Sequence, residues 1–166
     1  MHPPLVVHVI NRLDIGGLEN GLVNLLNLLP ANRYRQAVVC LSDVNPRFLE
    51  RIRARDVEVL SLDKRPGKDL RAYARMYRTL RRLRADVVHT RNLGTMQMQW
   101  VAAAARVPHR VHGEHGWDAS DPRGLNRKSL LIRRGCRPAI QRYLAMSRDI
   151  ARWLVEAVGV PQRSVF

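Results

Sequence analysis

Cysteines and aromatic residues are scarce in this chain of 166 residues. Only 5% of the positions are Phe, Trp or Tyr, and the two cysteines, Cys40 and Cys136, form no CxxC pair. This spacing excludes a disulfide framework and favours buried thiols in a reducing compartment. Aromatic residues are not interleaved with the basic ones, and no helix-turn-helix or RNA-binding motif is present. A nucleic-acid-binding module is therefore only an alternative interpretation.

Long apolar runs are also missing. The longest, such as residues 100–105, are far shorter than the ~20 residues that a membrane span needs. The N-terminal Met-His-Pro-Pro has no basic segment followed by a long apolar one, so it does not have the pattern of a signal peptide. These features predict a soluble cytoplasmic protein, which could still lie against a membrane surface.

Acidic residues are outnumbered. The chain has 14 Asp and Glu against 29 Lys and Arg, which gives a net charge of +15. Residues 63–84 contain nine basic and two acidic side chains, and residues 123–142 contain seven basic and no acidic ones. The remaining segments are therefore nearly neutral. Since 46% of the residues are hydrophobic, the chain can form the core of one ordinary domain.

Short apolar runs alternate with stretches of helical spacing. Strands are predicted at residues 5–10, 37–41, 57–62, 86–90, 110–114 and 142–146, with the first, second, fourth and fifth inside the sheet. Helices are predicted at residues 18–29, 46–55, 69–84, 94–105, 123–141 and 148–158. The sequence therefore predicts an α/β fold with a doubly wound, mostly parallel, Rossmann-like sheet and helices on both faces. In such sheets, ligands bind at the carboxyl ends of the strands.

A loop with two adjacent glycines follows the first predicted strand. Gly16 and Gly17 let the backbone approach a ligand closely, and the next helix offers N–H groups to an anion. A tight turn without a ligand is the alternative. The spacing is not G-x-G-x-x-G, which argues against a nucleotide-dependent oxidoreductase with Asp43 as the ribose acceptor.

Two histidines, a glutamate and a tryptophan gather at residues 111–117, at the end of the fifth predicted strand. In a strand, His112 and Glu114 share one face and His115 points to the other, which disfavours a zinc site. A His or Glu in this position can transfer protons or hydrogen-bond a sugar hydroxyl. A solvated strand end with a spare histidine is the alternative.

The fourth predicted strand also ends in polar residues. His89 lies inside the strand and is expected to be a hydrogen-bonded core residue. Arg91 and Asn92 fall in the loop, where they could bind a polar substrate or its phosphate. Ser147 follows the sixth strand without a G-x-S-x-G motif, so we expect it to cap a helix.

Together, these motifs resemble the N-terminal domain of GT-B-fold glycosyltransferases, specifically the retaining enzymes of family 4. Residues 16–19 are similar to the family's G-G-x-E, residues 110–117 to its V-x-T-x-H-G-aromatic segment, and residues 144–147 to its strand before a Ser. The segments at 112–118 and 126–128 resemble sugar transferases of bacterial exopolysaccharide and exosortase-linked gene clusters. Gly113 stands where the family usually has Thr.

The resemblance implies roles for individual residues. Gly16 and Gly17 would contact the donor diphosphate or the acceptor, Glu19 would brace their loop, and His115 would be the catalytic residue beside the transferred sugar. The remaining candidate substrate- or phosphate-binding residues are Arg91, Asn92, Glu114, Gly116 and Trp117. No metal or cofactor is required, because basic side chains and helix N-termini can hold a diphosphate.

Family members are considerably longer and have a second domain, which binds the nucleotide sugar and carries an E-x7-E motif that is not found here. The resemblance therefore implies that residues 1–166 are one domain, the acceptor-side half of a larger hexosyltransferase, and are inactive alone. The expected partners are a nucleotide sugar held mainly by the missing domain and a glycan or lipid-linked acceptor in polysaccharide synthesis.

Arginines recur at helical spacing in the helix predicted at residues 69–84. They form a stripe beside an apolar side; the stripe is Arg71, Arg75, Arg78 and Arg82, and the apolar side is Leu70, Tyr73, Tyr77, Leu80 and Leu83. One interpretation is a solvated face that keeps the protein soluble. The other is docking on anionic phospholipid at the inner face of the cytoplasmic membrane, where each basic side chain contributes ~1 kcal/mol.

Overall fold

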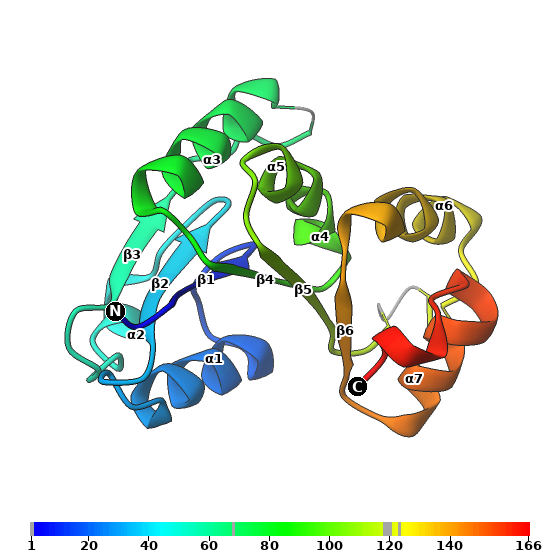
Figure 1. Cartoon of the computed structure of the whole chain (residues 1–166), viewed down its shortest axis with the longest axis horizontal. Coiled ribbons are helices and arrows are strands. Elements are labelled where there is room, and N and C mark those ends of the chain that lie inside the picture. Colours follow the sequence, from blue (N-terminus) through cyan, green and yellow to red (C-terminus); the bar gives the residue numbers. More distant parts are fainter. Residues whose placement is uncertain (1, 68, 118–120, 123) are drawn as a thin grey trace.

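A computed structural model describes residues 2–67, 69–117, 121–122 and 124–166 (Figure 1). Six parallel strands form one sheet in the order β3-β2-β1-β4-β5-β6. They are β1 (Leu5–Ile10), β2 (Arg35–Cys40), β3 (Glu58–Ser61), β4 (Val87–Arg91), β5 (His109–Glu114) and β6 (Arg142–Ala145). The predicted parallel sheet is confirmed, and β1, β2, β4 and β5 are its four interior strands, as expected.

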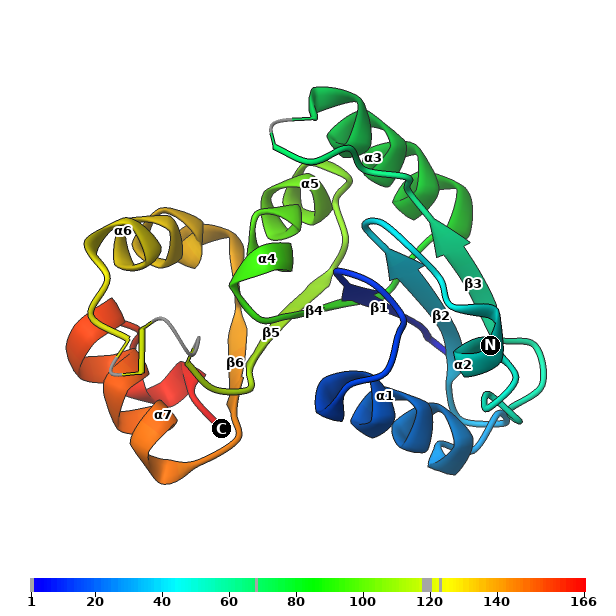
Figure 2. The same cartoon turned by 180° about the vertical axis from the view of Figure 1, so that it is seen from behind.

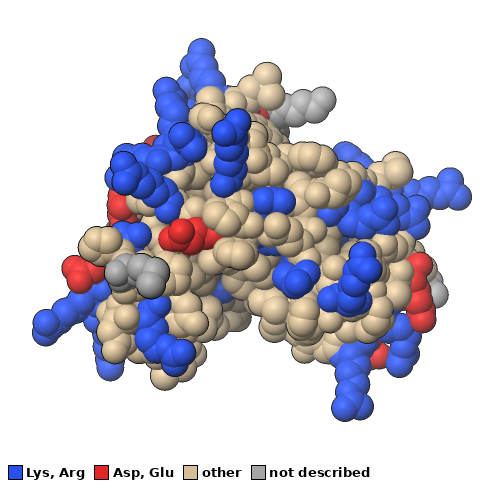
Figure 3. Space-filling view, viewed as in Figure 1, with Lys and Arg blue, Asp and Glu red and all other residues tan. Residues whose placement is uncertain are grey.

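Helices lie on both sides of this sheet (Figures 1 and 2). One side carries α3 (Leu70–Leu83), α4 (Leu93–Met96), α5 (Met98–Ala104) and α6 (Arg127–Cys136), and the other carries α1 (Gly17–Leu28) and α7 (Arg148–Trp153). The shorter elements are α2 (Pro46–Leu49), the 3-10 turns η1 (Arg137–Ala139) and η3 (Gln162–Ser164), and the π-helix η2 (Leu154–Val158). Between α1 and α7 no helix of the described residues covers β4 and β5, and the molecular outline is indented there (Figure 3).

Apolar side chains on both faces make the interior strands suitable for a buried parallel sheet. In β1, Val7 and Val9 pack in the cluster that contains α3 and α5, whereas Ile10 packs in the cluster that contains α1. A third cluster joins β6 to α6 and α7. Cys40 and Cys136 are buried and form no disulfide, as predicted.

The helix predicted at residues 46–55 is wrong beyond Leu49, where α2 ends. The Asn27 side-chain oxygen accepts hydrogen bonds from the N–H groups of Arg53 (2.7 Å) and Ala54 (3.1 Å). These bonds replace the ones that a continuing helix would make. A second predicted helix, residues 94–105, is interrupted at Gln97 and becomes α4 and α5.

The basic helix predicted at residues 123–141 is also shorter. It begins as α6 after Asn126, whose side chain accepts from the N–H of Ser129 at 3.1 Å, and turns into η1 at Pro138. Residue 123 lies outside the described residues. The last helix begins as predicted, because the Ser147 hydroxyl accepts from the N–H of Ile150 at 3.2 Å, and it continues as η2.

The buried side of α3 differs from the predicted apolar side. Ala72, Met76 and Leu80 are buried, four residues apart along the helix, and Met76 and Leu80 pack in the cluster that contains Val7 and Val9 of β1. Leu70 is 81% exposed and Tyr77 is 42% exposed, so the prediction was wrong at these two positions. Leu70 and Tyr77 lie off this line and face solvent.

Candidate functional site

A pocket of about 330 Å³ opens at the carboxyl ends of β4 and β5. Its walls come from the β4–α4 junction, the segment after β5, and α6; the lining residues are Asn92, Leu93, Gly94, Gly116, Trp117, Asp121, Gly124, Ser129 and Arg133. Three predicted site residues, Asn92, Gly116 and Trp117, are thus brought together from two loops. This is the edge at which open parallel sheets bind their ligands.

Asn92 joins the two loops of this pocket. Its side-chain oxygen accepts a hydrogen bond from the N–H of His115 at 3.1 Å, and its own N–H donates to the carbonyl of Gly113 at 2.9 Å. Its φ of 57° is in the left-handed region, which Asn tolerates better than most residues. Asn92 therefore fixes the segment that carries His115 against the end of β4.

Trp117 forms an aromatic wall of the pocket. Its ring meets that of Trp153 edge to face, with 6.1 Å between the ring centroids. Gly124 packs against both rings, so closely that a Cβ there would lie 2.5 Å from Trp117 and 2.8 Å from Trp153. Within the described part of the chain, the buried Nε1 of Trp117 has no hydrogen-bond partner. An aromatic face suits a ligand that has an apolar surface, such as the C–H face of a sugar.

Glu114 lies behind the pocket in a buried ion pair. Its side chain is 1% exposed and accepts hydrogen bonds from Arg133 Nε (2.8 Å) and Nη2 (3.2 Å), with His112 Nε2 at 3.4 Å. Burial raises the pKa of Glu114, but the hydrogen bonds and charges of His112 and Arg133 lower it by more, so it is below its ordinary value. The expected substrate contact of Glu114 needs correction, because this carboxylate is occupied within the protein. Glu114 positions Arg133 at the pocket wall.

His89 and His115 lie on the opposite face of the sheet from Glu114, as predicted for His115. Both reach over Gly113, where a Cβ would be 3.1 Å from the Nε2 atom of either ring. Neither Nε2 atom has a partner among the described residues, so His89 lacks the hydrogen bond expected there. Burial and then the charge of Arg91 lower the pKa of both histidines.

Arg91 is the last residue of β4, not a loop residue as predicted, and it is 5% exposed. Its Nη1 lies 3.2 Å from Nδ1 of His8, a buried residue of β1 whose ring centroid is 5.7 Å from that of His89. Burial and the charge of Arg91, against a smaller raising effect of Gln36, lower the pKa of His8 to about 3. Sequence reasoning missed His8. A polar residue inside an otherwise apolar strand was the available signal.

The loop after β1 carries the predicted glycines. The Glu19 side chain folds back against Gly16 and occupies the space that a Cβ would take, a position that suits the bracing role predicted for it. Gly17 is exposed with open space above it, and no side chain caps the N-terminus of α1. Asn45 anchors the loop by donating to the Asp14 carboxylate at 2.8 Å.

The sequence from residue 15 to residue 166 matches the profile of Glycosyltransferase Family 4. The chain belongs to this family. No curated protein sequence matches it.

Solved structures share the fold of this family 4 chain. HepE of Anabaena, in complex with UDP and glucose, is 15% identical with a TM-score of 0.73, over 98% of this chain and 43% of that one. A glycosyltransferase from Rickettsia africae is 14% identical with a TM-score of 0.68, over 100% and 42%. A UDP-GlcNAc 2-epimerase from Neisseria meningitidis, bound to UDP-GlcNAc, is 16% identical with a TM-score of 0.60, over 99% and 45%. The family 4 chain spans less than half of these structures, and at such identities the likeness shows the fold.

Gly113 is where this family 4 chain departs from the family's usual Thr. The structure gives a physical reason, since the two imidazoles over Gly113 fill the space of a larger side chain. A hydroxyl at this position is replaced by ring nitrogens that come from β4 and from the segment after β5.

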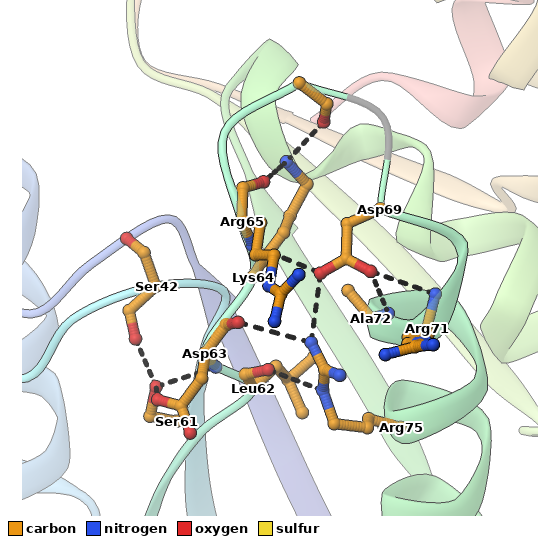
Figure 4. Close-up of polar contacts among 11 residues, drawn as sticks. Ser42, Ser61, Leu62, Asp63, Lys64, Arg65, Asp69, Arg71, Ala72 and Arg75 are labelled. Carbon is orange, nitrogen blue, oxygen red and sulfur yellow. Dashed lines mark hydrogen bonds and ion pairs between the residues drawn. The ribbon is translucent and has the colours of Figure 1, made fainter.

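Two of the four arginines predicted for membrane docking are held by the domain. Arg75 donates to the Leu62 carbonyl (2.6 Å) and pairs with Asp69 (3.1 Å), as Figure 4 shows. Arg82 pairs with Glu58 at 2.6 Å. The predicted docking stripe of four arginines therefore needs correction at Arg75 and Arg82. The exposed basic residues of α3 without an ion pair among the described residues are Arg71, Arg78 and Arg81.

Lys and Arg side chains are spread over the visible face of the family 4 chain instead of forming one patch (Figure 3). Part of the second basic segment is structural, because Arg134 and Arg137 donate to the carbonyls of Ala157 (2.7 Å) and Gly159 (2.5 Å). No described helix has the length and apolar character needed to cross a bilayer.

Proposed function

We propose that the protein containing this domain transfers a hexose from a nucleotide sugar to a glycan or lipid-linked acceptor in bacterial polysaccharide synthesis. The observation that carries this proposal is the pocket at the ends of β4 and β5, where Asn92, Gly116 and Trp117 converge in a family 4 chain. The HepE structure, which contains UDP and glucose, supports a sugar as ligand because it shares the fold. The exopolysaccharide and exosortase-linked transferases are the narrower class that we favour.

In this proposal the pocket binds the acceptor sugar. The Trp117 ring supplies an apolar face, while Asn92 and Ser129 supply polar groups in the same pocket. His115 faces the transferred sugar, with its backbone fixed by Asn92. Its neutral ring can hydrogen-bond a hydroxyl and stabilise the positive charge that develops on the sugar.

The departing diphosphate requires positive electrostatic potential. The N-terminus of α1 has no side-chain cap, and its first residue, Gly17, leaves open space above the backbone. Helix N-termini of this kind bind phosphate through their N–H groups and dipole. Gly16 and Gly17 would then stabilise the leaving group without a metal ion or cofactor.

Donor binding is assigned mainly to a second domain. Residues 1–166 span 43% of HepE, and the family resemblance attributes the nucleotide sugar to the other half. We therefore expect residues 1–166 to give no measurable sugar transfer alone. Sugar transfer by a highly purified preparation of residues 1–166 would contradict the assignment of donor binding to a second domain.

The test of the site is sugar transfer by the full-length protein with a pair of histidine variants. His115→Ala should lower kcat by ~10²–10⁴-fold, the contribution usual for a residue that stabilises charge or transfers a proton. His109→Ala is the matched control, because His109 is exposed at the start of β5, the end of the strand that lies away from the site. If His115→Ala retains activity within a few-fold of wild type, the residue is structural and the assignment is wrong. His112 is unsuitable as a control, because it is fully buried beside Glu114.

We propose further that α3 docks the protein on the inner face of the cytoplasmic membrane. Its exposed arginines are joined by two apolar side chains at the surface, Leu70 and Tyr77, and such a mixture favours the interface of an anionic bilayer. Co-sedimentation with anionic and neutral vesicles tests this. Binding should require anionic lipid and should fall in a triple Gln variant of the α3 set Arg71, Arg78 and Arg81. The control is a second triple Gln variant, of Arg33, Arg53 and Arg55, which has the same change of net charge. Equal loss of vesicle binding in both triple variants would contradict docking through α3.

A further inference from the structure

Arg91 is a buried cation without a carboxylate partner. Its side chain is 5% exposed, and burial lowers its pKa to about 10, which leaves it charged at neutral pH. Among the described residues, its side chain makes one hydrogen bond, to Nδ1 of His8. By contrast, the similarly buried Arg133 and the half-buried Arg75 each pair with a carboxylate. An unpaired buried charge is costly, so the surroundings of Arg91 lack an anion.

The imidazoles around Arg91 add buried ring nitrogens that have no hydrogen-bond partner. A guanidinium only donates, so Nδ1 of His8 must accept, and in the neutral ring the proton then lies on Nε2. The Nε2 atoms of His89 and His115 have no hydrogen-bond partner within the described part of the chain, whereas the His8 ring also interacts with the side chain of Gln36. The cluster therefore combines one positive charge with several buried polar atoms that are not satisfied by the protein.

The cluster lies near the carboxyl ends of the strands. His89, Arg91 and Gly113 alternate onto the same sheet face, the one that is left uncovered between α1 and α7 (Figure 1). His89 and His115 are half-buried, whereas His8 and Arg91 are buried below them. A ligand that enters between α1 and α7 at the carboxyl ends of the strands would meet the imidazoles first and the guanidinium next.

We propose that Arg91 and the imidazoles of His89 and His115 bind a phosphate group of a sugar substrate. A phosphate offers several acceptor oxygens from one centre, which matches a guanidinium and imidazole nitrogens that come from β4 and from the segment after β5. A cation does not fit, because Arg91 is itself positive and no group of described histidines is arranged to hold a metal ion. The inference rests on the proposed function and narrows its substrate. A donor diphosphate and a phosphorylated acceptor share this chemistry.

Calorimetric titration of residues 1–166 at 150 mM salt tests the site with three probes: inorganic pyrophosphate, UDP and glucose 1-phosphate. Arg91→Met should raise the Kd of the probe that binds by ~10–100-fold, the loss expected for a charge-assisted contact. Arg33→Met has the same net charge and changes an exposed arginine in the loop before β2, so its Kd should equal that of wild type. Neutral glucose should not compete for the anion.

The variant also separates binding from folding. Arg91→Met removes an unpaired buried charge, so without an anion its urea midpoint should equal or exceed that of wild type. In wild type, the bound anion should raise the pKa of His89 and His115, which imidazole NMR resolves. Binding of pyrophosphate and UDP alone identifies the donor as the source of the phosphate, and binding of glucose 1-phosphate identifies the acceptor.

Absence of anion binding, or an unchanged Kd in Arg91→Met, would overturn the proposal. The proposed function is tested apart from it by sugar transfer in the full-length protein. Transfer with no Arg91-dependent anion binding refutes only the phosphate site. Arg91-dependent binding in a protein that transfers no sugar refutes only the proposed function.

Discussion

Replacing Arg133 with Met removes one half of the buried pair behind the pocket. The variant loses two charge-assisted hydrogen bonds, of 2.8 and 3.2 Å, and the contact of the guanidinium with the Trp153 ring at 4.9 Å. The carboxylate of Glu114, which is 1% exposed in the wild-type structure, is left with only His112 beside it. Breaking a buried ion pair in this way costs about 3–5 kcal/mol, most of it because the remaining charge is unpaired.

Urea unfolding followed by circular dichroism measures this cost. With a urea dependence of about 2 kcal/mol per M, a loss of ~4 kcal/mol lowers the midpoint by ~2 M. The double variant Glu114→Gln/Arg133→Met should be more stable than the two single effects added together, by ~1–3 kcal/mol, because it contains no unpaired charge. Since the pKa of Glu114 lies below its ordinary value, the pair stabilises the fold above about pH 4.5 and loses this effect as the pH falls further. A cost below ~1 kcal/mol, with additive single effects, would refute the role given to this pair.

The lowered pKa values of His8, His89 and His115 predict acid lability. The folded rings stay neutral while the unfolded chain takes up protons below about pH 6.5, so stability declines from there by up to ~1.4 kcal/mol per pH unit for each ring. His8→Gln should lessen this slope in urea midpoints measured from pH 7 to pH 4, and an unchanged slope would contradict burial of a neutral His8. Gly124→Ala should destabilise the fold by ~1–3 kcal/mol, because the residue has a φ of 63° and both tryptophan rings against it. Both glycine effects are measured by thermal unfolding. Gly135→Ala is the control, because Gly135 is exposed on α6 with open space around it, and this variant should be neutral or stabilising.

The strands were predictable because each of them is specified locally. The run at residues 5–10 is almost entirely β-branched or aliphatic, and both faces of β1 are indeed buried. Uninterrupted runs of this kind indicate interior strands, which is why four of them could be placed inside the sheet. The cap at Ser147 was predictable for the same reason, since the capping group and the N–H that it accepts from lie three residues apart.

The partners of buried polar groups were not predictable from local pattern. Glu114 and Arg133 are 19 residues apart, and Arg91 meets His8 across 83 residues, so neither contact leaves a periodic signal. The early end of α2 likewise depends on Asn27, a residue of α1. The sequence could therefore place the candidate residues at the carboxyl ends of the strands, while the contacts of each charged residue required the tertiary structure.

The most direct measurement is the identity of the product that the full-length protein makes from nucleotide sugars. A panel of UDP-hexoses is incubated with neutral glycans, sugar phosphates and polyprenyl-phosphate-linked sugars, and the products are resolved by mass spectrometry. We predict that one hexose is transferred to an acceptor, and that Trp117→Ala loses the transfer because the pocket wall is removed. Isomerisation of the UDP-hexose without transfer, or transfer that is unaffected by Trp117→Ala, would contradict the function assigned to this pocket.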